Sequence, residues 1–184
     1  ASTEWAFNGV PGKEVDWPAL HDRIAPLVAD AEKNKDGLAF YRAIHAFTLA
    51  IPDGHTGVGG GQFAQQDFVE QTSGGYGFAI RELDDGRFIV VYVLSGGPAA
   101  EAGMEVGAEV TGFNGESISD AVSKVEPYAG PFSMESSRRY QQARYLLRGK
   151  EGDEATLIFA NTRGESQPVK LTAIAERESF VVTS

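Results

Sequence analysis

The sequence contains no cysteine and only three histidines. The lack of cysteine excludes disulfide bonds, thiolate metal sites and cysteine nucleophiles. It is compatible with export from the cytoplasm without establishing it. His21 and His45 lie on separate predicted helices at no ligand spacing, and no cluster of carboxylates accompanies them. We therefore expect no metal site and no cofactor.

Basic residues are also scarce. The chain has 16 Lys and Arg against 26 Asp and Glu, a formal net charge of -10, and its longest basic cluster is the pair Arg138 and Arg139. A nucleic-acid-binding protein needs a basic face that neutralises phosphates. Nucleic acid is therefore not an expected partner.

Long apolar runs are missing as well. The longest, residues 88–94, is far shorter than the about twenty residues that span a bilayer, so no transmembrane helix is expected. The sequence lacks an initiator methionine and a basic-then-apolar leader. This indicates either that a targeting segment was removed or that the sequence starts inside a longer gene.

What remains is the composition of a globular protein, with 42% hydrophobic and 23% charged residues over 184 positions. A chain of this length buries about 70% of its unfolded surface and forms one large domain or two small ones.

Two amphipathic helices are predicted in the first third. Asp16 is placed to cap the first helix, and Pro18 stands near its start. Apolar residues recur at three- and four-residue spacing over 20–31 and again over 40–51. The interruption at 34–37 therefore predicts a helical hairpin.

A boundary follows this hairpin. Pro52-Asp53-Gly54 ends the second helix, and Gly59-Gly60-Gly61 marks a turn. From residue 74 the pattern changes to short β segments with turn signals at Asp84-Asp85-Gly86 and Asn114-Gly115. We predict a helical region at 1–58 and a linker at 59–73.

The later part of the chain predicts an α+β fold. Strands are expected at 76–83, 88–94, 109–113, 155–160 and 169–173, and helices at 98–103, from residue 119, and at 134–147. Together with the hairpin, these elements predict a small, mostly antiparallel β-barrel or sandwich with two or three helices, following an N-terminal helical region.

Three local strings resemble a PDZ domain of the bacterial type. Gly75-Tyr76-Gly77-Phe78 resembles the carboxylate-binding loop, the residues from Gly97 to Gly103 resemble the Pro-Ala-x-x-Ala-Gly turn, and Phe113-Asn114-Gly115 resembles the following strand and hairpin. The resemblance implies a PDZ domain at 74–173. Residues 174–184 are then expected to begin a linker to a further domain.

The wider sequence resembles the carboxyl-terminal processing and tricorn-like serine peptidases. Those enzymes place a helical region ending in an Asp-x-His-Thr string before a PDZ domain, and this chain has Asp53-Gly54-His55-Thr56 before its PDZ pattern. The family's catalytic domain, with a nucleophilic serine and a lysine or histidine base, has no counterpart here. The resemblance implies an inactive N-terminal fragment of an extracytoplasmic serine endopeptidase, whether periplasmic, secreted or lipoprotein-anchored.

The PDZ resemblance also implies a peptide-binding site. Its candidate residues are Gly75, Tyr76, Gly77, Phe78, Ala79 and Ile80 in the loop and strand, and Tyr140, Ala143 and Leu147 on a helix. Glycines would let backbone N–H groups converge on a terminal carboxylate, and the strand edge would accept the peptide. The alternatives are a plain hairpin turn for the loop and core packing for the helix.

His55 is the candidate catalytic residue, although its nucleophile is absent. An imidazole titrates near neutral pH and serves as a general base to a hydroxyl, as the family's tricorn branch implies. The alternative is a structural histidine that fixes its loop, with Asp53 or Thr56 as a local partner.

Three functions remain open on this sequence, and the third of them is a complete hydrolase within these residues. The first is the substrate-recognition and regulatory fragment of a carboxyl-terminal processing peptidase, with polypeptide substrates bound through free carboxyl termini and a catalytic domain elsewhere in the same protein. The second is a freestanding PDZ peptide-binding or scaffold module with no attached peptidase.

Overall fold

The computed structural model describes residues 14–183, which divide into two compact units. The first unit contains residues 14–67 together with Ala129–Glu135, and the second contains Phe68–Tyr128 together with residues 136–183. The first thirteen residues of the predicted helical region lie outside the described part. Helices and antiparallel sheets both occur, which confirms the α+β class.

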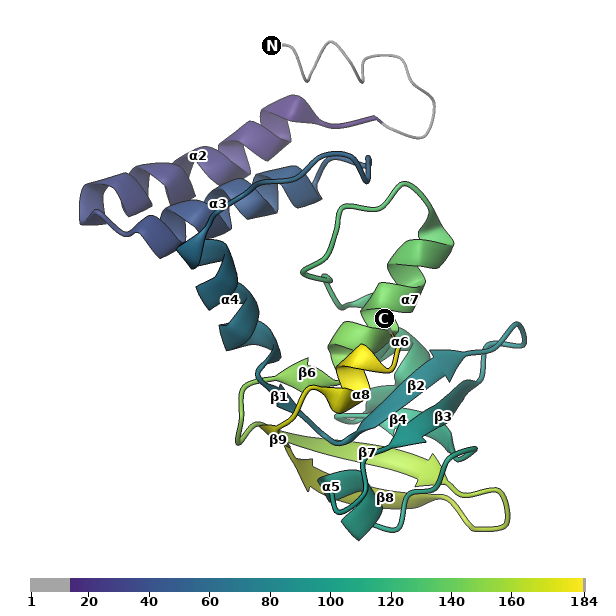
Figure 1. Ribbon diagram of the computed structural model, residues 1–184. Helices are drawn as coiled ribbons and strands as arrows, with labels where there is room; N and C mark the ends of the chain where they lie inside the picture. The colour runs from purple at the N-terminus through teal and green to yellow at the C-terminus, as the bar shows by residue number, and fades with distance from the viewer. Residues whose placement is uncertain (1–13, 184) are drawn as a thin grey trace. The chain divides into compact units, whose positions relative to one another are not determined.

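The first unit is built on a helical hairpin, as predicted (Figure 1). Its helices are α2 (Trp17–Asn34) and α3 (Gly37–Leu49). Asp16 caps α2 by accepting the N–H of Ala19 at 3.0 Å, and Asp36 caps α3 in the same way. Lys35 takes a left-handed conformation between them.

Helix α4 (Gln62–Thr72) follows a segment without regular structure and lies within the predicted linker. The division between the two units falls inside it, after Asp67. Asp67 is 1% exposed and accepts a hydrogen bond from Arg42 Nε at 2.6 Å. The N-terminal half of α4 is therefore held to the helical hairpin by a partly buried ion pair.

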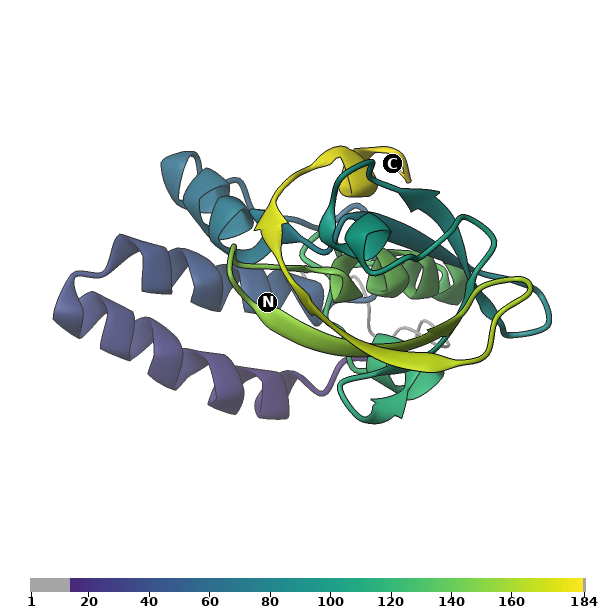
Figure 2. The ribbon, with the colours of Figure 1, turned by 90° about the horizontal axis from the view of Figure 1, so that it is seen from below.

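The main sheet of the second unit is antiparallel, in the order β2-β3-β4-β7-β8. Its strands are β2 (Phe78–Glu82), β3 (Phe88–Val93), β4 (Glu109–Phe113), β7 (Glu154–Ala160) and β8 (Gln167–Thr172), with β5 (Glu116–Ser117) beside β4. Figure 2 shows β7 and β8 running side by side as a long hairpin. Strand β2 is at the other edge of this sheet.

A smaller sheet and four helices complete the unit. The sheet has the order β6-β1-β9, from β6 (Arg148–Gly149), β1 (Gly74–Gly75) and β9 (Ile174–Ala175). The helices are α5 (Pro98–Glu101), α6 (Ile118–Ser123), α7 (Glu135–Leu146) and α8 (Glu178–Val181).

The core of the second unit lies between the main sheet and its helices. Phe78, Phe88 and Phe159 are each at most 1% exposed, and β7 alternates buried and exposed side chains along its length. This alternation is the period of a strand with one face on the core. The predicted turn at Asn114-Gly115 is also present, since Asn114 takes a positive φ of 49° and Gly115 one of 84°.

Residues 174–183 differ from the sequence-based expectation of a linker. They pair with β1 through β9, form α8 and bury Ser179 and Thr183. The physical reason is a buried arginine, Arg148, which draws Glu176 against the second unit. The other predicted domain boundaries stay predictions.

Candidate peptide-binding site

Strand β2 and helix α7 supply the two walls of the candidate site. Phe78, Ala79 and Ile80 from β2 line one cavity with Arg144 of α7 and with Leu147, the residue after that helix. The structure thus brings four of the predicted residues to the same place, namely Phe78, Ala79, Ile80 and Leu147, whereas Tyr140 and Ala143 are not among the residues that line this cavity. The cavity retains a volume of only ≈ 10 Å³, because residues near the end of the chain fill the rest.

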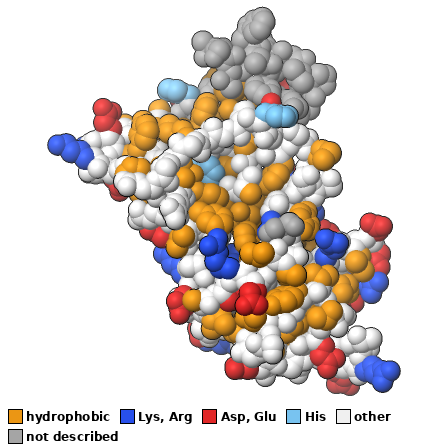
Figure 3. Space-filling view, in the orientation of Figure 1, with side chains coloured by type: hydrophobic (Ala, Val, Ile, Leu, Met, Phe, Trp, Pro, Cys, Tyr) orange, Lys and Arg blue, Asp and Glu red, His pale blue; other side chains and the backbone are white. Residues whose placement is uncertain are grey.

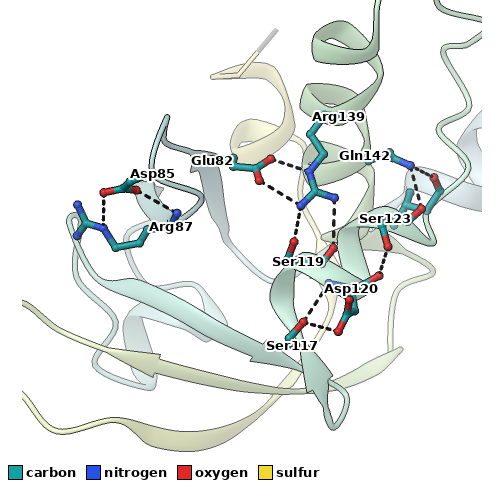
Figure 4. A network of polar contacts seen from close by, with 10 residues as sticks. Glu82, Asp85, Arg87, Ser117, Ser119, Asp120, Ser123, Arg139 and Gln142 are labelled. Carbon is teal, nitrogen blue, oxygen red and sulfur yellow. Dashed lines mark hydrogen bonds and ion pairs between the residues drawn. The ribbon is translucent and has the colours of Figure 1, made fainter.

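An arginine clamp fixes the distance between these walls (Figure 4). Arg139 of α7 donates from Nε to Glu82 Oε2 at 2.6 Å and from Nη2 to Oε1 at 3.1 Å, at the end of β2. It also donates to the carbonyl and the hydroxyl of Ser119 in α6. A bidentate pair of this kind is geometrically specific. Helix α7 is therefore held against β2 by a directed contact.

Most of the predicted site residues also belong to the core. Phe78, Ile80, Ala143 and Leu147 are at most 3% exposed and are part of the hydrophobic cluster. Tyr140 is partly buried, and its hydroxyl donates to the carbonyl of Thr183. The structure therefore shows core packing at Phe78, Ile80, Ala143 and Leu147, and groove lining stays a prediction.

Tyr76 is likewise a core residue. Its side chain is 5% exposed and its ring meets Phe113 edge-on, with 6.3 Å between ring centroids. Burial, with a smaller effect of the Asp153 carboxylate, raises the pKa of the Tyr76 phenol. Its backbone carbonyl accepts the N–H of Ala99, which attaches the loop to α5.

The predicted carboxylate-binding loop begins inside the small sheet. Gly74 and Gly75 form β1 and pair with β6 on one side and β9 on the other, so their backbone groups are directed at neighbouring strands. Gly77 follows with a φ of +77°, which favours glycine. The turn around Gly77 is thus the part of the loop outside the small sheet.

Gly75 has a second reason to be glycine. A Cβ atom there would lie 1.9 Å from Glu176 Oε1 and 2.0 Å from Arg148 Nη1, closer than atoms can approach. These two side chains form an ion pair that is almost fully buried, with 5% and 1% of each side chain exposed. Gly75 therefore leaves room for the ion pair.

The Arg148–Glu176 pair is the centre of a buried hydrogen-bond network. Arg148 Nη2 donates to the carbonyls of Thr72, at 2.8 Å, and of Glu176. Ser179 donates to the Glu176 carboxylate from its hydroxyl, at 2.6 Å, and from its backbone N–H, at 3.0 Å. This network ties the start of α8 to β6 and to the end of α4.

The environment changes the pKa of both partners. Burial lowers the pKa of the Arg148 guanidinium, against the raising effect of Glu176. Burial opposes ionisation of Glu176, but the two hydrogen bonds from Ser179 and the Arg148 charge outweigh it, so the pKa of Glu176 lies below its usual value. Glu176 is therefore ionised at neutral pH. Arg148 is charged as well, because arginine does not deprotonate in proteins.

His55 lies in the first unit and is 95% exposed. Its Nδ1 lies 2.9 Å from Asp53 Oδ1, which also accepts the His55 backbone N–H. The hydroxyl of Ser133 accepts the N–H of Gly54 at 2.9 Å. A carboxylate at Nδ1 orients an imidazole so that Nε2 faces outward, the arrangement of a general base and equally of a histidine fixed by its own loop.

Comparison with protein families gives a match for this part of the chain. A family model described as "PDZ domain" matches residues 65–126, from α4 to the region after α6. The chain contains a PDZ domain. PDZ domains in general bind extended peptides by adding them as a strand to a sheet edge.

Solved structures with similar folds extend beyond the PDZ domain. Mature CPAF is 13% identical with a TM-score of 0.53, and the match covers 94% of this chain and 33% of CPAF. CPAF complexed with lactacystin gives 13% identity, a TM-score of 0.52, and coverage of 94% and 34%. At these identities the similarity establishes a shared fold. The chain spans about a third of the length of CPAF.

A third structure is the PDZ domain of a carboxy-terminal protease from Vibrio cholerae in complex with peptide. It is 17% identical, with a TM-score of 0.36, and the match covers 56% of this chain and 95% of that one. Among curated protein sequences, none matches this chain.

Sequence reasoning missed the polar residues at the PDZ groove, above all Arg144, Arg148 and Glu176. Charged residues on a helix or in a tail usually indicate a solvated surface. Several of the partners of Arg144 and Arg148 come from residues 176–183, which carry no periodic pattern.

Within residues 14–183, no three His, Asp or Glu side chains meet as a potential metal site. None of the described helices combines the length and apolar character needed to cross a membrane. On the face drawn in Figure 3, basic side chains are scattered among acidic ones.

Proposed function

We propose that this chain is the substrate-recognition and regulatory part of a carboxyl-terminal processing type serine peptidase. Its PDZ domain would capture the free carboxyl terminus of a polypeptide and present it to a catalytic domain of the same protein. The proposal is supported by the order of the parts, since a helical unit with the Asp53-Gly54-His55-Thr56 string precedes a PDZ domain. The fold of both parts is shared with CPAF, which supports the same order.

The observation that carries peptide binding is the placement of β2. It is an edge strand with β3 as its neighbour in the main sheet, and α7 stands beside it, clamped through Arg139. A peptide added to this edge would gain backbone hydrogen bonds from β2. Its last side chain would meet Phe78, Ile80 and Leu147, which are apolar, and its carboxylate would meet the turn around Gly77.

His55 has a role in this proposal as a general base. Asp53 would hold the imidazole through Nδ1 and leave Nε2 to accept a proton from a serine in the catalytic domain. By itself, this chain would have no peptidase activity. The peptidase would act outside the cytoplasm, as its family resemblance implies.

The test of peptide binding is a titration followed by amide shifts in NMR. A peptide ending in an apolar residue should shift signals of residues 77–82, with weak affinity because ordering the peptide offsets much of the gain. The same peptide with an amidated terminus should bind at least about tenfold more weakly, since the charge recognised at Gly77 is gone. Equal affinity of the two forms would refute recognition of a free carboxyl terminus.

A further inference from the structure

The edge of β2 is covered although it has no second neighbour in the main sheet. Phe78, Ala79 and Ile80 are between 1% and 4% exposed, whereas an edge strand open to a peptide should present its outer edge to water. The cover consists of residues 176–183, which we call the 176–183 segment. Its helix α8 contacts β2, and Figure 1 draws α8 beside β2 and the end of α7.

The groove wall binds the backbone of this segment. Arg144 of α7 donates from Nη2 to the carbonyl of Phe180 at 2.8 Å and from Nε to the hydroxyl of Thr183 at 3.0 Å. Tyr140, a predicted peptide-binding residue, donates to the carbonyl of Thr183. Contacts to carbonyl groups depend little on the sequence of the bound segment, so the same donors would suit another peptide.

An aromatic side chain is the apolar anchor. The Phe180 ring lies 4.3 Å from the guanidinium carbon of Arg144 and 5.1 Å, centroid to centroid, from Tyr145, which meets it edge-on. Both arrangements are favourable for aromatic rings. Phe180 also lines the small residual cavity together with Phe78, Ile80 and Leu147. The segment thus places one large apolar group where the end of a peptide is expected.

The anchoring is uneven along the segment. Glu176 is fixed in the buried network with Arg148 and Ser179, whereas Val181 and Val182 are 61% and 54% exposed. The part from Phe180 onward is held through Phe180 and Thr183, outside the Glu176 network, and can detach while Glu176 stays in place. Short elements with few buried contacts are the ones that open most readily.

We infer that the 176–183 segment is an intramolecular ligand of the PDZ groove, and that a peptide binds only when this segment leaves it. The inference rests on the proposed peptide-binding function and adds its regulation. It also specifies the ligand, because a peptide whose terminal residue is aromatic would take the place of Phe180. A groove occupied most of the time lowers the apparent peptide affinity in proportion to its open fraction.

The test compares the unmodified chain with its Phe180→Ala variant, using a fluorescent peptide that ends in phenylalanine. Removing the anchor should open the groove and strengthen peptide binding by about tenfold or more. Val182→Ala is the matched control, since it shortens an exposed apolar side chain of the same segment and should leave affinity unchanged. Thermal melting checks that each variant is folded.

Hydrogen exchange on the unmodified chain gives a second readout that needs no variant. A saturating amount of the same peptide should speed exchange at the amides of Val181 and Val182, whose acceptors lie within the segment. In the opposite direction, a synthetic peptide of residues 176–183 should displace the fluorescent peptide from the Phe180→Ala variant.

The outcomes separate the two proposals. Equal binding by the parent chain and Phe180→Ala, with unchanged exchange at Val181 and Val182, would overturn the intramolecular ligand and leave peptide binding intact. Absence of binding to both folded proteins would overturn the peptide-binding function and the inference together. Tighter binding by the variant with faster exchange in the parent chain supports both.

Discussion

At the scale of single residues, position 75 requires glycine for two separate reasons. The glycine belongs to the string that resembles a carboxylate-binding loop, and the structure adds the close approach of the Arg148–Glu176 pair. Breaking a buried ion pair costs more than the pair contributes, because the remaining charge stays buried without its partner. The glycine is therefore coupled to the stability of the 176–183 segment.

Gly75→Ala should destabilise the second unit by about 1–3 kcal/mol, since its methyl group must displace a buried charge pair. Chemical denaturation measures this free energy of unfolding. The control is Gly164→Ala in the turn after β7, where the nearest atom to the new Cβ is 3.7 Å away, ordinary van der Waals contact. A Gly75→Ala variant as stable as this control would show that the pair relocates freely.

The stability of the folded protein should depend on pH through Glu176. Its pKa is lowered in the folded protein, so its stabilisation is complete above the unfolded value of about 4.3 and is lost as pH falls through the lower folded value. The charges that face it include Arg148. The stability advantage of the parent chain over Glu176→Gln should therefore be largest near neutral pH and shrink below about pH 4.

Thermal melts of both proteins between pH 3 and pH 7 measure this difference. A constant difference across that range would contradict an ionised Glu176 in the buried network.

At the scale of elements, α7 contacts β2 and also contributes a side chain to the groove. Its Arg139 binds the end of β2, and its C-terminal part contributes Arg144 to the groove. Gln142 between them donates to the carbonyls of Ser123 and Val125, at the end of α6 (Figure 4). The position of the groove wall thus depends on contacts at both neighbours of the helix.

Arg139→Ala should cost about 1–2 kcal/mol of stability and should weaken peptide binding by moving α7, because it removes a bidentate pair whose side chains are only 23% and 27% exposed. Arg138→Ala is the matched control one position away. Its pair with Glu126 is 3.4 Å long and more than 40% exposed on both sides, so its loss should cost about 0–1 kcal/mol. Urea denaturation measures the free energy of unfolding of both variants. Equal losses would show that the Arg139–Glu82 pair does not hold α7 against β2.

The elements that the sequence predicts well are those with a local signal. Apolar periodicity and the cap at Asp16 predict the helical hairpin, and the turns at Gly86 and Asn114 delimit strands of the main sheet. The segment after residue 173 has no such signal. Its structure is set by Arg148, far away in the sequence, and single-sequence patterns do not carry that information.

The same reason explains what was and was not predicted of the candidate site. The resemblance to PDZ domains predicted that residues of β2 and α7 belong together, and the structure places Phe78 and Leu147 at one cavity. The occupant of the groove was not predicted. Neither was the fact that Gly74 and Gly75 take part in a sheet, because their strand partners come from two distant segments.

At the scale of the whole molecule, the two units are joined more than once along the chain. The chain passes from the first to the second within α4, returns to the first for Ala129–Glu135, and then completes the second. The glycine-rich stretch before α4 has no regular structure, and a Cβ at Gly57, Gly59 or Gly61 would meet no atom within 4 Å. Exposed loops of small residues are preferred sites of proteolytic cleavage.

Limited proteolysis should therefore cut first between residues 57 and 61. Mass spectrometry of early products should show fragments of residues 1–57 and 62–184, or close to these. Early cleavage within 88–113, which includes β3 and β4 of the main sheet, would contradict the expected order. The Arg139→Ala variant is a useful comparison, since loosening α7 should leave this first cut unchanged.

The contact between Gly54 and Ser133 also sets an order of events during synthesis. Protein domains begin to fold as they leave the ribosome, N-terminal parts first. The hydroxyl that accepts the Gly54 N–H belongs to Ser133, and Ser133 emerges only after β1 to β5 and α6 of the PDZ domain. The loop that carries His55 therefore reaches its final hydrogen bonding late, after most of the PDZ strands have been made. A ribosome that stalled before residue 133 would hold a nascent chain with both hairpin helices complete and this loop still unanchored.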